Sequence, residues 1–137
     1  MQPSADFRLS KSEKLCSPTD IDLLFANSGG SQSFIAFPLR VVWRHNTTRR
    51  DTSDLNVKFL VSIPKKRLRH AVDRVRMRRL VREAYRLGRS GLALDTPMPL
   101  DIAFIYVDSG RHDYATISRA MTKALTRISD AITAAQP

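Results

Sequence analysis

The spacing of apolar residues predicts three helices along the chain. The first is short and carries Ile21, Leu24 and Phe25 at helical intervals. The second covers residues 71–89, and the third begins at Asp113. The third is amphipathic, because one face collects the apolar residues Ile117, Ala120, Ala124, Ile128 and Ile132.

Between these helices lie segments with the composition of strands. Ser33 to Arg44 is extended and apolar, and Pro38 interrupts it, which predicts an edge position or a bulge. Asn56 to Ile63 is a further strand, and Leu100 to Val107 is a continuous apolar strand. The order is therefore helix, strands, helix, strand, helix, which predicts an α/β domain of two packed layers.

Length and charge bound the class of protein. With 137 residues the chain suits one domain, which we place at residues 15–135 after a polar, flexible tail at residues 1–14. The net charge of +10 predicts a polyanionic partner, either nucleic acid or an anionic membrane surface. We expect a cytoplasmic location, because we find no membrane-spanning apolar run and no signal peptide, and the single Cys16 excludes an intrachain disulfide.

Almost all of the net charge lies in residues 65–89. This segment holds eleven Lys and Arg but only two acids, Asp73 and Glu83, so it carries +9. On a helical wheel the side facing the core collects Met77, Leu80, Val81, Ala84 and Leu87. The opposite side collects Arg74, Arg78, Arg79, Arg82, Arg86 and Arg89, with Arg76 nearer a margin. Neither acid falls at the centre of this basic side.

A basic side of this kind predicts contact with phosphates. Like charges four residues apart repel each other on a helix, and phosphates relieve that repulsion. Within residues 71–89 every basic residue is Arg, whose guanidinium binds phosphate oxygens in pairs. A solvated basic helix and a helix lying on anionic lipid are the alternatives. We disfavour lipid, because the apolar side is narrow and is needed to cover the sheet.

The basic helix also carries a long motif. The stretch Ala71-Val72-Asp73-Arg74-Val75-Arg76-Met77-Arg78-Arg79-Leu80-Val81-Arg82-Glu83-Ala84-Tyr85-Arg86 resembles the signature helix of the bacterial ribonuclease P protein family, whose pattern runs Ala-Val-x-Arg-Asn-Arg-x-Lys-Arg-x-x-Arg-Glu. A strand ending in Lys-Lys precedes both. The other elements match in order and spacing, so the resemblance covers residues 8–130. Val75 stands where the family has Asn, and we expect weaker local RNA contact there.

The resemblance implies a fold and an assembly. The fold is an α+β two-layer sandwich in the order α-β-β-β-α-β-α, with a left-handed βαβ crossover like that of a ribosomal protein domain. The assembly is a ribonucleoprotein endoribonuclease whose catalytic RNA and Mg²⁺ remove the 5′ leader of precursor tRNA. The implied RNA contacts are Lys65, Lys66, Arg74, Arg76, Arg78, Arg79, Arg82 and Arg86. We expect no DNA partner and no cofactor or metal held by the protein itself.

The family holds the single-stranded leader in a cleft between the first helix and the sheet. Binding a single strand requires stacking surfaces and positive charge. The candidates in this chain are Phe25, Phe37, Arg40, Lys58 and Tyr106. For Phe25 and Phe37 a place in the core is an equal alternative, and the positions of Lys58 and Tyr106 depend on strand register.

We predict no catalytic residue in the chain. His45, His70 and His112 lack the spacing of metal ligands, and Cys16 has no evident His partner. No cluster of carboxylates indicates a two-metal nuclease. Two rival hypotheses stay open: a ribosomal or general RNA-binding protein, which would use the same basic side, and a protein-only nuclease, which the missing acids disfavour.

Overall fold

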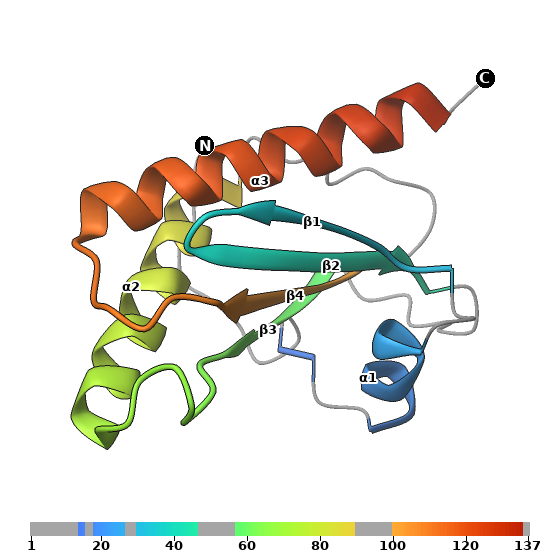
Figure 1. The fold of residues 1–137 in the computed structure, drawn as a ribbon. Helices are drawn as coiled ribbons and strands as arrows, with labels where there is room; N and C mark the ends of the chain where they lie inside the picture. The colour runs from blue at the N-terminus through green and yellow to red at the C-terminus, as the bar shows by residue number, and fades with distance from the viewer. Residues whose placement is uncertain (1–13, 16–17, 27–29, 47–56, 90–99, 136–137) are drawn as a thin grey trace, which may run out of the picture.

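The computed structural model describes residues 14–15, 18–26, 30–46, 57–89 and 100–135. The elements in this part of the chain are α1 (Pro18–Phe25), β1 (Gln32–Ala36), β2 (Leu39–His45), β3 (Val57–Ser62), α2 (Ala71–Gly88), β4 (Leu100–Tyr106) and α3 (Tyr114–Ala135) (Figure 1). The predicted order α-β-β-β-α-β-α is confirmed. No helix among the described residues is long and apolar enough to cross a membrane.

The four strands form one mixed sheet in the order β1-β2-β4-β3. β1 and β2 pair antiparallel, as do β2 and β4, whereas β3 and β4 pair in parallel. Parallel neighbours need a crossover connection. Helix α2 lies in that connection, so the β3-α2-β4 unit fixes the basic helix against the sheet.

Pro38 lies in a turn. Ala36 pairs with Leu39 across the ladder between β1 and β2, so Phe37 and Pro38 form a two-residue hairpin loop. The peptide bond between them is cis. The prediction of an edge position or a bulge within one strand is therefore wrong: the chain reverses at this point and makes two strands.

One face of the sheet packs against α2 and α3 and forms the main core (Figure 1). Side chains alternate along a strand, so Val41 and Trp43 of β2 and Phe104 of β4 point to this face. Phe59 of β3 stacks on Tyr85 of α2, with ring centroids 4.1 Å apart. Burying a side chain of this size stabilises the fold by about 1.5–3 kcal/mol.

The core side of α2 differs from the helical-wheel prediction at its margins. Met77, Val81 and Ala84 are buried as predicted. Leu87 is 43% exposed, so its assignment to the core is wrong, and Tyr85 is buried instead with 1% exposed. The aromatic contact with the sheet explains the difference, because it turns the helix toward Tyr85 and away from Leu87.

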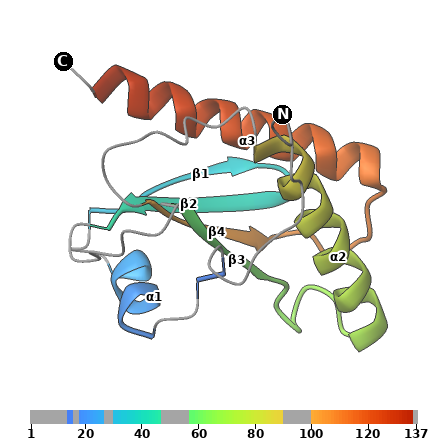
Figure 2. The same cartoon turned by 180° about the vertical axis from the view of Figure 1, so that it is seen from behind.

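The other face of the sheet packs against α1 over part of its area. Leu24 of α1 is buried with Val42 of β2 and Ala103 of β4. Figure 2 shows the molecule from behind, with α1 on the side of the sheet away from α3. Ile35 and Arg40, which are register partners, remain exposed farther along this face.

Lys14 joins the sheet. It forms an isolated parallel bridge with Phe59, and the backbone N–H of Leu15 donates to the Phe59 carbonyl at 2.9 Å. Lys14 was assigned to the flexible tail, and that assignment is wrong for this residue. Residues 1–13 and Cys16 lie outside the described residues.

A buried polar pair lies near one end of β4. Asp101 and Asn46 are both fully buried, and the Asn46 side-chain amide donates to the Asp101 carboxylate at 2.9 Å. The register partners of Asp101 on the two neighbouring strands are Arg44 and Lys58, both cationic. Since a buried carboxylate needs hydrogen bonds and opposite charge, Asp101 has a structural role.

We predict that Asn46→Ala lowers the free energy of unfolding by about 1–3 kcal/mol, because the buried Asp101 carboxylate loses a donor. Urea denaturation would measure the change. Gln32→Ala, at an exposed position of β1, is the control and should change stability by less than about 0.5 kcal/mol. Equal stability of the two variants would show that the pair does not stabilise the fold.

Candidate nucleic-acid interface

The outer side of α2 is a basic surface with an apolar centre. Arg76, Arg79 and Arg82 are exposed, and Arg78 is half-buried. Val75 is 49% exposed, so it lies on this outer side and not in the core. Two adjoining grooves meet at Val75. One is lined by Val75, Arg78, Arg79, Arg82, Glu83 and Arg86. The other is lined by Val72, Asp73, Val75, Arg76, Arg79 and Arg111.

Arg74 is engaged within the protein. Its Nη1 donates to the backbone carbonyls of Leu68 at 2.9 Å and Arg69 at 2.8 Å. These carbonyls belong to the segment that leads from β3 into α2. Arg74 therefore braces the start of the helix, and the guanidinium that was predicted for RNA contact is partly used by the fold.

Arg86 is paired with Glu83. Its Nη2 lies 2.5 Å from one carboxylate oxygen and its Nε donates to the other at 3.1 Å. The hydrogen bond from Arg86 lowers the pKa of the Glu83 carboxyl. Glu83 was expected at a margin of the basic side, and from there it neutralises one of the arginines assigned to that side, Arg86. Asp73 lies 3.5 Å from Arg111, at the far margin.

Four other arginines of the basic surface have no acidic partner among the described residues: Arg76, Arg78, Arg79 and Arg82. We call these four the open arginines. Lys65 and Lys66 are exposed in the turn before α2, where the Arg67 N–H donates to the Pro64 carbonyl at 3.0 Å. Unpaired cations fixed on one helix repel each other, so an anionic ligand stabilises this surface.

A separate groove lies between α1 and the sheet. Its lining comprises Leu24, Phe25, Ala26, Ser31, Ser33, Arg40, Val42 and Ile105. Phe25 is 45% exposed, so it is available at the surface, and Arg40 is exposed on β2. The Ser31 hydroxyl donates to the Leu24 carbonyl at 2.5 Å and ties the end of α1 to β1. Two of the five leader candidates, Phe25 and Arg40, therefore meet in one groove.

The other three leader candidates lie elsewhere. Phe37 is 58% exposed in the hairpin loop, with its ring edge-on to His112 at 5.7 Å. Lys58 does not line the groove, and its register partner is the buried Asp101. Tyr106 is fully buried and its hydroxyl donates to the Gly110 carbonyl, while burial raises its pKa to about 12. Tyr106 is therefore a core residue and not a stacking surface.

Two groove residues were missed at the sequence level. Ser33 and Ile105 point to the same face as Arg40, because strand side chains alternate and Ile105 is the register partner of Arg40. The sequence of each strand shows which of its side chains share a face, but it does not show how neighbouring strands are aligned. The sequence alone therefore could not bring these residues together.

The connection between β4 and α3 contains a further polar pair. His112 Nε2 lies 2.6 Å from the Asp108 carboxylate, and the Ser109 N–H also bonds Asp108. The His112 hydrogen bond is the main cause that lowers the pKa of Asp108. Among the described residues, no three His, Cys, Asp or Glu side chains gather as a metal site requires. The arrangements that the structure does show are a basic surface on α2 and a groove beside α1.

The different roles of Arg74 and Arg76 lead to a prediction. Arg74→Ala should lower the free energy of unfolding by about 1–2 kcal/mol, because a charged donor to two carbonyls is lost. Arg76→Ala removes the same side chain from the exposed surface and should change stability by less than about 0.5 kcal/mol. Urea denaturation of both variants measures this, and equal losses would contradict a bracing role for Arg74.

Known proteins share both the sequence and the fold. A family model described as ribonuclease P matches residues 9–129. The chain is 40% identical over 131 residues to the ribonuclease P protein component of a Porphyromonas gingivalis strain, covering 93% of this chain and 91% of the relative. The same component of a second strain is 41% identical over 125 residues, covering 89% and 87%.

Solved structures agree on the fold. The RNase P protein of Staphylococcus aureus superimposes with a TM-score of 0.64 at 17% identity, covering 86% of this chain and 95% of that one. The RNase P protein of Thermotoga maritima gives a TM-score of 0.64 at 23% identity, covering 85% and 97%. With a family model spanning most of its length and relatives at 40% identity, the chain belongs to the ribonuclease P protein family.

Proposed function

We propose that this chain binds the catalytic RNA of ribonuclease P through α2 and the 5′ leader of precursor tRNA through the groove beside α1. In this way it assists endonucleolytic removal of the leader, which leaves the mature tRNA 5′ end. The observation that carries the proposal is the set of open arginines on one rigid helix, in a member of a family that acts in tRNA 5′ processing.

The chemistry of the open arginines fits a phosphate backbone. Each guanidinium presents several N–H donors in one plane and binds two phosphate oxygens together. Such contacts release counterions from the RNA, so the affinity falls steeply with salt. Because α2 is held against the sheet, its arginines are positioned before the RNA arrives, which reduces the entropy lost on binding.

The groove beside α1 fits a short single strand. Phe25 offers a ring face for stacking, Arg40 offers a charge for phosphate, and Ser31 and Ser33 offer hydroxyl groups. Its volume is about 320 Å³, which suits a short piece of strand and not a duplex. Stacking and charge are sequence-tolerant, which suits leaders of varied sequence.

In this proposal the RNA and its Mg²⁺ carry out catalysis. The protein contributes by neutralising phosphates where the catalytic RNA and the precursor approach each other, and by holding the leader. Two RNAs repel strongly at low Mg²⁺, so the contribution of the protein is greatest there.

Reconstituted cleavage tests the proposal. Precursor tRNA is incubated at low Mg²⁺ with the protein alone, with the catalytic RNA alone, and with both. Efficient cleavage is expected only in the mixture, because each component supplies what the other lacks. Absence of stimulation by the protein would contradict the proposal and favour a general RNA-binding protein, whereas cleavage by the protein alone would favour a nuclease.

A variant of the groove separates leader binding from RNA binding in the same assay. Arg40→Ala should weaken the affinity of the holoenzyme for precursor tRNA but leave its affinity for mature tRNA unchanged, because only the precursor carries a leader. An equal effect on both tRNAs would place Arg40 outside the leader site.

The salt dependence of RNA binding tests the basic surface. Replacing both Arg78 and Arg82 by Ala should weaken binding of the catalytic RNA and reduce the slope of log affinity against log salt by about one unit per lost phosphate contact. Replacing Arg119 and Lys123, exposed on α3, removes the same charge and serves as the control. A slope that falls equally in both double variants would mean that only net charge matters.

A further inference from the structure

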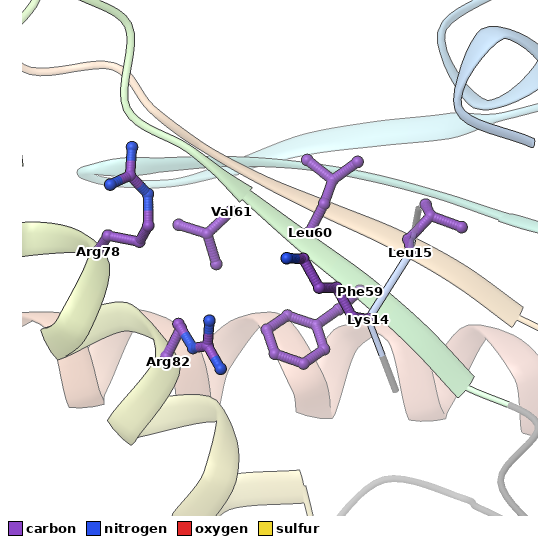
Figure 3. A pocket seen from close by; sticks show the side chains of 7 residues that line it. All are labelled: Lys14, Leu15, Phe59, Leu60, Val61, Arg78 and Arg82. Atoms are coloured by element: carbon purple, nitrogen blue, oxygen red, sulfur yellow. The ribbon is translucent and has the colours of Figure 1, made fainter. Parts of the chain in front are cut away.

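A further cavity lies at the outer edge of the sheet, between β3 and α2 (Figure 3). β3 is an edge strand, and its one neighbour on the outer side among the described residues is the bridge at Lys14. Arg78 and Arg82 project from α2, and Lys14, which pairs with Phe59 at the strand edge, extends toward the cavity beside Phe59 (Figure 3). The cavity therefore carries three cations from two separate segments of the chain.

The floor of the cavity is apolar. Val61 lines it on the helix side of β3, while Leu60 and Leu15 line it on the opposite side, so the cavity wraps around the strand edge (Figure 3). Phe59 lies beneath and is only 5% exposed. A purely anionic ligand such as inorganic phosphate would leave this apolar surface in water. The cavity suits a ligand with an anionic part and a flat apolar part.

The cavity is continuous with the basic surface. Arg78 and Arg82 line both this cavity and the groove along α2. An RNA backbone that follows the open arginines therefore passes the cavity. In addition, strand alternation directs the backbone N–H and C=O of Val61 to the same edge as those of Phe59, where a base edge can bond them.

The size of the cavity limits the ligand. Its volume is about 220 Å³, below the range of about 300–1,000 Å³ that holds drug-sized molecules. One nucleobase fits such a space, and a stacked pair does not. RNA-binding proteins commonly take unstacked bases into pockets of this kind.

We propose that this cavity receives a single unpaired nucleotide of the RNA bound to α2. The base lies against Leu60 and Val61, and the phosphate lies between Arg78, Arg82 and Lys14. The inference rests on the proposed function, since it names the kind of RNA element that α2 selects: a bulged or looped-out nucleotide beside a backbone, and not a continuous duplex.

A titration with adenosine monophosphate tests the cavity without the large RNA. In ¹⁵N-labelled protein we expect saturable shifts at the backbone amides of Leu15, Leu60 and Val61. Ribose 5-phosphate, which has the phosphate but no base, should bind at least tenfold more weakly. Equal binding of the two ligands would show an anion site only and overturn the proposal, as would the absence of shifts at β3.

A substitution that fills the cavity tests the proposal, and a matched substitution elsewhere serves as its control. Val61→Phe adds bulk without changing charge, and it should abolish the adenosine monophosphate shifts and weaken binding of the catalytic RNA about tenfold, as expected when one base loses its place. Ala115→Phe adds the same bulk at an exposed position of α3 and is the control. Unchanged RNA affinity in a folded Val61→Phe protein would overturn the proposal.

A charge variant covers the case in which Val61→Phe fails to fold. Lys14 is exposed and lies outside the core, so Lys14→Glu should not disturb folding. This variant should abolish adenosine monophosphate binding, whereas the control Lys123→Glu, at an exposed position of α3, should not. Arg79→Ala serves as a reference for the basic surface. If Arg79→Ala weakens RNA binding and the cavity variants do not, the cavity proposal fails alone. If none of them weakens RNA binding, the proposed function fails.

Discussion

Helix α2 is held mainly by its apolar side, while the arginines on its outer side repel one another. Met77, Val81 and Tyr85 are buried against the sheet and α3, and this burial offsets the repulsion among the open arginines. Because α2 lies in the crossover connection between β3 and β4, both of its ends are joined to strands of the sheet against which it packs. The basic grooves and the edge cavity depend on this packing, because both are lined by side chains of α2.

The same sheet separates the binding surfaces. α2 with its arginines covers one face and one edge, whereas the groove beside α1 opens on the other face. In the proposed function, the RNA and the leader would therefore be held by different side chains and would not compete for them. The edge strand β3 lies between the two regions, and the cavity at this edge is where apolar surface and positive charge meet.

Local periodicity predicted the elements, and tertiary contacts decided the details. Spacing alone located all three helices, and the one-sided distribution of arginine located the main surface. Tyr85 replaced Leu87 in the core because its ring packs on Phe59, a contact between distant segments. Tyr106 proved to be buried because register sets which strand residues face the core, and register is not visible in one sequence. The engagement of Arg74 and Arg86 likewise depends on partners that a helical wheel does not show.

The Glu83–Arg86 pair places a carboxylate at one margin of the basic surface. This carboxylate engages Nη2 of Arg86 at 2.5 Å and its Nε at 3.1 Å, which leaves the other N–H donors of the guanidinium unused by Glu83. If α2 binds RNA as proposed, a phosphate near Arg86 would use those other donors or compete with Glu83 for the same ones. Arg86 would then contribute less to affinity than the open arginines. The carboxylate would thus favour RNAs that engage several open arginines over polyanions that meet only this margin.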